Sequence, residues 1–207
     1  MAGGRGTRFW PASRRKLPKP FLPVTGDKTL LQLTVDRCLP LVPAERVWLV
    51  IAADNLGPAR EQLPEMPADN FIGEPQGRST APCLAVAAEL IRRRDPEAVL
   101  IALPADHLIK EEDKFRAMLK AAGAYAQRAG VLVTIGIKPR FPHTGFGYIR
   151  TGEQLAAAEP WPVSAVREFV EKPDRPFAEQ LLSRGALWNS FIFVATAASL
   201  LRLFDRA

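Results

Sequence analysis

Residues 2–19, AGGRGTRFWPASRRKLPK, form the stretch on which the interpretation of the fold depends. The stretch opens with three closely spaced glycines, Gly3, Gly4 and Gly6. Glycine lets backbone N–H groups approach an anion without an obstructing Cβ, and rows of such groups bind phosphate. Arg8 and Lys19 add positive charge that holds a polyphosphate and stabilises charge on a leaving group. In open α/β sheets such a loop follows a buried strand. The stretch therefore predicts an α/β protein that binds a nucleoside triphosphate.

The spacing of the glycines separates this loop from two better known phosphate loops. G-G-x-G lacks the six-position pattern G-x-G-x-x-G of dinucleotide-binding folds and the G-K-[ST] ending of a P-loop. Glycines alone would equally describe a turn beside solvated basic residues. Arg8 and Lys19 favour the phosphate-binding interpretation.

Outside this stretch, short apolar runs alternate with helical patterns, which predicts a mostly parallel sheet with helices on both faces. Strands are expected at 47–52, 70–73, 99–103 and 131–137, and helices at 30–38, 56–63, 82–94 and 114–129. Further expected elements are strands at 147–150 and 166–171, a helix at 177–184, a strand at 188–194 and a helix at 197–204. Ser79 or Thr80 is the expected N-cap of helix 82–94.

Composition describes one ordinary globular domain. The chain has 207 residues, of which 47% are hydrophobic and 24% charged. No apolar run approaches the about 18 residues of a membrane span, and no signal peptide opens the sequence. Cys38 and Cys83 fall in apolar helical patterns, which indicates buried, reduced thiols. We therefore expect a cytoplasmic protein without a membrane partner.

The net charge of +6 raises the question of nucleic-acid binding. The basic residues gather in the first loop and in one expected helix end, Arg92, Arg93 and Arg94. Basic side chains are favoured at helix C-termini, so this run is interpreted as a solvated helix end. No basic stripe interleaved with aromatic residues accompanies it. Small phosphorylated substrates account for the charge, and no nucleic-acid partner is expected.

The motifs along the chain resemble those of one family. AGG-x-GTR-x-x-P…PK resembles the signature loop of sugar-phosphate nucleotidyltransferases, in the form typical of mannose-1-phosphate guanylyltransferases. Further motifs follow in the family's order: EPQGRSTAP at 74–82, PADH at 104–107, TGFGYI at 144–149, FVEKP at 169–173 and WNS at 188–190. The resemblance implies the Rossmann-like nucleotide-diphospho-sugar transferase fold. It also implies Mg²⁺ as cofactor and GTP and mannose 1-phosphate as substrates, giving GDP-mannose and pyrophosphate.

The resemblance assigns the nucleotide site to the first loop and to the 74–82 motif. The residues implied are Gly3, Gly4, Gly6, Thr7, Glu74, Arg78, Ser79 and Thr80, with Arg8 and Lys19 as catalytic cations. Glu74 carries a chemical argument of its own. Guanine offers two adjacent donors, N1–H and the 2-amino group, and a carboxylate accepts from both. A surface glutamate is the alternative if Glu74 faces solvent.

Asp106 is the expected catalytic metal ligand. It follows the expected strand 99–103, at the sheet edge where ligands bind in open α/β folds. Mg²⁺ prefers one or two carboxylates together with phosphate oxygens. An aspartate after a strand is otherwise often a helix cap. By resemblance Asp106 is one of two metal ligands, the second lying beyond residue 207, and His107 is a structural hydrogen-bonding residue and not a general base.

The sugar phosphate is assigned by resemblance to the later motifs. The residues implied are Gly145, Gly147, Glu171, Lys172 and Asn189. Glutamate and asparagine accept or donate hydrogen bonds to sugar hydroxyls, and lysine pairs with a phosphate; Glu171–Lys172 alone would otherwise be a solvated pair. Phe191 departs from the family, which commonly has glycine there, and its ring would crowd the sugar pocket.

The chain is expected to be part of a catalytic domain, with a nucleotide-binding part at 1–137 and a sugar-phosphate-binding part at 138–207. Both ends look cut, since the family carries a strand before the glycine loop and further sequence after the last helix. Alternatives stay open: another nucleotide or hexose 1-phosphate, or a binding module without catalysis. The oligomeric state is open as well, with a homodimer allowed.

Overall fold

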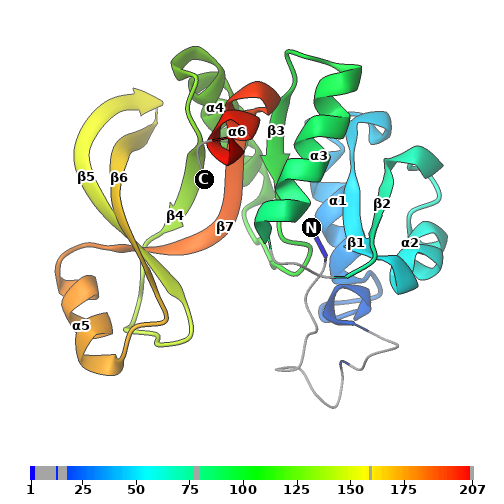
Figure 1. Cartoon of the computed structure of the whole chain (residues 1–207). Coiled ribbons are helices and arrows are strands. Elements are labelled where there is room, and N and C mark those ends of the chain that lie inside the picture. Colours follow the sequence, from blue (N-terminus) through cyan, green and yellow to red (C-terminus); the bar gives the residue numbers. More distant parts are fainter. Residues whose placement is uncertain (3–12, 14–17, 77–79, 159, 206–207) are drawn as a thin grey trace.

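Figure 1 shows the computed structural model, which describes residues 1–2, 13, 18–76, 80–158 and 160–205. These residues form two sheets with helices packed on them. The helices are α1 (Leu30–Cys38), α2 (Leu56–Gln62), α3 (Thr80–Arg94), α4 (Glu112–Ala129), α5 (Arg175–Ser183) and α6 (Ala197–Phe204). Short 3-10 turns lie at Lys19–Phe21, Ala44–Arg46, Ala53–Asn55 and Ala68–Asn70.

The smaller sheet is a parallel pair, β1 (Leu49–Ala52) and β2 (Phe71–Glu74). Successive side chains of a strand point to opposite faces. Leu49 and Ile51 accordingly share a core with α1 and α2, whereas Val50 packs against Cys83 of α3. Helices therefore cover both faces of this pair, as the apolar runs predict.

The larger sheet comprises β3 (Val99–Ala102), β4 (Val133–Ile137), β5 (Gly147–Ala158), β6 (Trp161–Glu171) and β7 (Leu187–Thr196). All of its pairings are antiparallel. Val194 pairs with both β3 and β4, so these two strands lie on opposite edges of β7. Trp188 pairs with both β4 and β5, which puts β5 beside β7 on the same edge as β3. The long, curved β7 thus holds the sheet together (Figure 1).

The expectation of a mostly parallel sheet is corrected for the described residues. β3 and β4 run in the same direction, but β7 lies between them and is antiparallel to both. Helices do cover both faces of this sheet. Ile192 and Val194 pack against α4, whereas Ala195 packs with α3 and α6 on the other face. The fold is therefore α/β, with a small parallel sheet and a larger antiparallel one.

Two residues at the start of the chain connect the sheets. The Met1 amine donates to the Leu103 carbonyl at 3.0 Å, and the Met1 carbonyl accepts from Ala105 N at 2.9 Å. Ala2 N donates to the Val50 carbonyl of β1 at 3.0 Å. Met1 and Ala2 therefore lie between β1 and the segment that follows β3.

Local sequence signals explain where several helices begin and end. Thr29 forms a capping box with Gln32 at the start of α1, and the Asp174 side chain caps α5. Gly130 ends α4 in the left-handed conformation, with φ 65°. Thr80 is the first residue of α3, and the other expected cap, Ser79, lies outside the described residues.

The arginines at the end of α3 make more contacts with other side chains than a solvated helix end would. Arg92 and Arg93 both pair with Glu89 one turn earlier. Arg94 stacks over the Trp48 ring at 4.4 Å. The run therefore ends the helix as expected, but Arg94 also joins α3 to the segment before β1.

Candidate functional site

The two candidate catalytic residues that the structure describes are in contact. Lys19 starts a 3-10 turn after Pro18, and Asp106 lies in the segment after β3. Lys19 Nζ lies 2.8 Å from Asp106 Oδ2, with the two side chains 23% and 36% exposed. A lysine and an aspartate 87 residues apart in sequence thus meet at the carboxyl end of β3. Such a pair can bind phosphate through the lysine and a cation through the carboxylate.

Much of the predicted nucleotide site falls outside the described residues. This applies to Gly3, Gly4, Gly6, Thr7, Arg8, Arg78 and Ser79. The flanking residues Ala2, Lys19 and Thr80 are described, and Thr80 is half-buried at the start of α3.

Glu74 is the last residue of β2 and pairs in register with Ala52, at the carboxyl ends of the parallel strands. It is half-buried. Burial lowers the pKa of the Met1 amine, and nearby negative groups oppose this, Glu74 and Asp106 among them. Asp106 directly follows Ala105, whose N–H donates to the Met1 carbonyl, and Glu74 ends the strand paired with β1, whose Val50 carbonyl accepts from Ala2 N.

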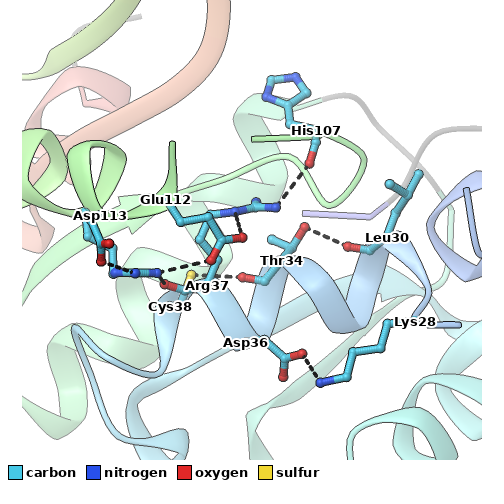
Figure 2. Close-up of polar contacts among 10 residues, drawn as sticks. Lys28, Leu30, Thr34, Asp36, Arg37, Cys38, His107, Glu112 and Asp113 are labelled. Atoms are coloured by element: carbon cyan, nitrogen blue, oxygen red, sulfur yellow. Dashed lines mark hydrogen bonds and ion pairs between the residues drawn. The ribbon is translucent and has the colours of Figure 1, made fainter. Parts of the chain in front are cut away.

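A buried arginine that the sequence analysis missed supports the Asp106 segment (Figure 2). Arg37 of α1 is 3% exposed, and its guanidinium donates to Glu112 at 3.3 Å and to the His107 carbonyl at 3.5 Å. The Arg37 carbonyl in turn accepts from Arg116 at 3.4 Å. These contacts join α1 to the start of α4 and to the residue after Asp106. The available signal was an arginine within the apolar helix sequence LLQLTVDRC.

His107 contributes to this network through its backbone. Its carbonyl accepts from Arg37, while Figure 2 shows its imidazole ring directed away from that contact. Burial lowers the pKa of His107, which favours the neutral ring. The contact agrees with a structural role, although its hydrogen bond is made by the main chain.

The candidate sugar-phosphate residues Gly147, Glu171 and Asn189 converge where β5, β6 and β7 meet. Gly147 pairs with Glu171 across β5 and β6. A Cβ on Gly147 would lie 2.7 Å from Glu171 Oε2 and 3.6 Å from Asn189 Cβ. Any larger residue would displace the Glu171 carboxylate. Lys172 Nζ lies 2.6 Å from Glu171 Oε1, so a carboxylate, an ammonium and an amide gather at one place.

Gly145, a further candidate for the sugar-phosphate site, lies against the imidazole ring of His143. Gly145 N donates to His143 Nδ1 at 2.9 Å, and a Cβ there would lie 2.8 Å from His143 Cε1. The Tyr148 hydroxyl accepts from His143 N and donates to the His143 carbonyl. These bonds fix the loop between β4 and β5.

An aromatic cluster that sequence reasoning did not identify covers this loop. His143 stacks on Phe146 with ring centroids 4.0 Å apart, and Phe141 and Phe146 both meet Trp188 edge-on. Trp188 Nε1 is buried and lacks a hydrogen-bond partner among the described residues. Trp188 and Asn189 are consecutive residues of β7, so their side chains point to opposite faces of the strand. Trp188 packs with Tyr148 and α5, and the cluster therefore supports the strand that carries Asn189 from the other face.

Metal-binding capacity in the described part of the chain rests on single carboxylates. Within it, no group of three or more His, Cys, Asp and Glu side chains could hold a metal ion. Asp106 remains compatible with Mg²⁺, which commonly takes one or two protein carboxylates and completes its shell with phosphate and water. No helix among the described residues is long and apolar enough to cross a membrane.

Comparison with known proteins identifies the class. The model of the nucleotidyl transferase family matches residues 1–204, and the chain belongs to this family. It is homologous to mannose-1-phosphate guanylyltransferases: it is 42% identical over 206 residues to the Escherichia coli K12 protein of that name. It is also 41% identical over 201 residues to the xanthan biosynthesis protein XanB of Xanthomonas campestris strain B100.

A solved structure supports the fold. The crystal structure described as mannose-1-phosphate geranyltransferase from Thermus thermophilus matches with a TM-score of 0.89 and 36% identity, covering all of this chain. The chain covers 58% of that structure, and 42% of the Escherichia coli protein. It therefore spans about two fifths of the length of the curated relatives it matches.

Proposed function

We propose that the protein transfers the GMP group of GTP to mannose 1-phosphate, producing GDP-mannose and pyrophosphate. Homology to mannose-1-phosphate guanylyltransferases over 95% of the chain supports this reaction. The observation that carries it is the 2.8 Å contact between Lys19 and Asp106 at the carboxyl end of β3. This edge is where α/β sheets bind nucleotides.

The reaction needs no protein nucleophile and no general base. A phosphate oxygen of mannose 1-phosphate, already anionic, attacks the α-phosphorus of GTP in line. The bond from the α-phosphorus to the bridging oxygen breaks, and its electron pair leaves with pyrophosphate. Lys19 and Arg8 would neutralise the charge that develops on the phosphates, while binding aligns the reacting atoms.

Mg²⁺ would be held through Asp106 and the phosphate oxygens of GTP, and when bound it supplies additional charge neutralisation at those phosphates. The partial exposure of the Asp106 carboxylate, 36%, leaves it accessible for this role. In the described structure Lys19 pairs with this same carboxylate, so the ammonium and the metal would divide the negative charge between them.

Base selection is proposed to depend on Glu74. Its two carboxylate oxygens would accept from guanine N1–H and from the 2-amino group. Glutamine in its place would offer one acceptor and one donor, which suits uracil and thymine. The half-buried location at the end of β2 supports a recognition role over a purely solvated one. Gly3, Gly4, Gly6, Thr7, Arg78, Ser79 and Thr80 would line the rest of the nucleotide site.

The proposal divides the chain into a nucleotide-binding part, 1–137, and a sugar-phosphate-binding part, 138–207. Gly145, Gly147, Glu171, Lys172 and Asn189 would form the sugar-phosphate site. We also propose that the fold of the whole protein contains a Rossmann-like, mostly parallel sheet. The bonds of Met1 and Ala2 to both β1 and the segment after β3 support a connection between the two described sheets. Two free cysteines whose pKa is raised by burial support a cytoplasmic location.

The test is pyrophosphate release with Mg²⁺, mannose 1-phosphate and each of the four common nucleoside triphosphates in turn. We expect release with GTP, and a shift of preference toward UTP in Glu74→Gln. Glu61→Gln, in the exposed part of α2, is the matched control and should retain the preference for GTP. Release with another nucleoside triphosphate in the unmodified chain would contradict guanylyl transfer and indicate transfer of a different nucleotide. GTP binding without any release would favour a non-catalytic binding module.

A further inference from the structure

Phe191 has a backbone conformation that its side chain disfavours. Its φ is 56°, in the left-handed region, although it lies within strand β7. A bulky residue with positive φ is a genuine outlier, because its Cβ crowds the neighbouring carbonyl. Strained residues of this kind gather at ligand sites, and an observed outlier justifies asking what it does there.

The strain results from an irregularity in the pairing of β7 with β4. Gly136 pairs with Asn189 and Thr134 pairs with Phe193, so three residues of β7 stand opposite Ile135 alone. The bulge is held by a buried serine: Ser190 Oγ donates to the Ile135 carbonyl at 2.6 Å. It is therefore a fixed feature of the sheet, and Phe191 is its exposed residue.

The bulge orients a candidate sugar-phosphate residue. Phe191 N donates to Asn189 Oδ1 at 2.9 Å. With its oxygen held in this way, Asn189 presents the Nδ2 group as the donor for a ligand. Asn189 also lies beside Gly147, because a Cβ added to that glycine would be 3.6 Å from Asn189 Cβ.

The ring lies at the surface beside a candidate sugar-phosphate residue. Phe191 follows Asn189 by two residues, and its N–H is bound to the Asn189 side chain. Its ring is 39% exposed and meets Phe193 at 6.5 Å in an edge-on contact. An exposed apolar surface therefore lies next to Asn189.

We propose that the Phe191 ring is a specificity-determining wall of the sugar-phosphate site, against which one apolar face of the hexose ring packs. This inference rests on the proposed function and names the residue that would select the sugar. Mannose carries its axial 2-hydroxyl on one face of the ring, and its C3 epimer, altrose, carries a further axial hydroxyl on the opposite face. If the phenyl ring packs on that opposite face, the axial 3-hydroxyl of altrose would lose its hydrogen bonds to water without a replacement, so altrose 1-phosphate would bind less well than mannose 1-phosphate.

The test compares Phe191→Gly and Phe191→Ala with the unmodified chain, using GTP with mannose 1-phosphate and with its C3 epimer, altrose 1-phosphate. Glycine adopts positive φ without strain, so Phe191→Gly keeps the bulge and removes only the ring. We expect the ratio of kcat/KM for the two sugars to fall about tenfold in both variants. Phe177→Ala removes a phenyl ring that is 38% exposed on α5 and should leave the ratio unchanged. A ratio within twofold of the unmodified value in Phe191→Gly would overturn the inference.

A second readout separates this inference from the proposed function. If the unmodified chain releases no pyrophosphate, the proposed reaction fails, and mannose 1-phosphate binding is then followed by saturation transfer from aromatic protons to sugar C–H protons. Transfer that is lost in Phe191→Gly and retained in Phe177→Ala supports the wall. Equal transfer in all three chains, or no binding at all, overturns it.

Discussion

Lys19 and Asp106 hold each other in place before any ligand binds, at a separation of 2.8 Å. If Lys19 stabilises charge on the leaving pyrophosphate, its removal should act on the transition state more than on bound GTP. We predict that Lys19→Ala lowers kcat by about 10²–10³-fold with a much smaller change in GTP affinity. Lys28→Ala breaks an exposed ion pair of similar length, 2.7 Å, and should change neither. Steady-state kinetics and calorimetric GTP titration measure the two effects, and equal losses in both would contradict the assigned role.

Backbone strain at Phe191 gives a prediction about stability that is independent of activity. Phe191→Gly should be more stable than Phe191→Ala by about 1–2 kcal/mol, since both lose the ring but only glycine tolerates φ 56°. At Phe177, within helix α5, the order should reverse, with glycine less stable than alanine by about 1 kcal/mol. Urea unfolding of the four variants provides the comparison. The same order at both positions would show that Phe191 is unstrained.

Among the elements, those with a clear apolar period could be predicted from the sequence. Helices α1 and α6 have the predicted bounds, 30–38 and 197–204. Strands β5 and β6 extend far beyond the predicted 147–150 and 166–171. They form a two-stranded ribbon with mostly exposed residues, so hydrogen bonding between the strands maintains them with little apolar alternation. The apolar pattern of a segment indicates that it forms a strand, but it does not indicate which strands it pairs with. The central location of β7 in the larger sheet was therefore not predicted.

Some residues of the candidate site could be predicted from the sequence, and others could not. Residue types and resemblance identified Lys19, Asp106, Glu171 and Asn189 as candidates. In the structure Lys19 contacts Asp106, and Glu171 and Asn189 both lie beside Gly147. Their assignment to substrate sites stays a prediction. Arg37 was missed, because its role depends on a fold-dependent contact with the His107 carbonyl and Glu112. Nothing in the spacing of residues 37, 107 and 112 indicates that they meet.

The attachment of α1 to α4 should depend on Arg37. Arg37→Met keeps the aliphatic bulk but leaves the His107 carbonyl and Glu112 without this donor. We predict a loss of about 2 kcal/mol in the free energy of unfolding, less than for a fully buried pair because Glu112 is 38% exposed. Lys114→Met breaks the exposed pair with Glu111 and should cost less than about 0.5 kcal/mol. Denaturant unfolding of both variants gives these values, and similar values would rule out a structural role for Arg37.

For the molecule as a whole, two partly buried bases predict how stability depends on pH. Burial lowers the pKa of the Met1 amine below 8.0 and that of His107 below 6.5. The unfolded chain then binds more protons than the folded chain just below each ordinary value, so the free energy of unfolding rises with pH in these ranges. We predict that stability falls as the pH is lowered from 8 to 5.5, a range in which most carboxylates stay ionised.

A histidine substitution isolates one part of this dependence. His107→Asn should have a flatter slope between pH 7 and pH 5.5 than the unmodified chain. Urea unfolding at intervals of half a pH unit measures both slopes. An unchanged slope in His107→Asn would assign the dependence to other groups.

The indole of Trp188 has an optical consequence. Its Nε1 is buried without a hydrogen-bond partner among the described residues, and two phenyl rings meet it edge-on. An indole in such dry surroundings emits at a shorter wavelength than one in contact with water. Trp188 directly precedes Asn189 on β7, so the two side chains point to opposite faces of the same strand. A ligand that shifts this strand when it binds the amide would change the surroundings of the indole, and the emission colour would register that movement without an added dye.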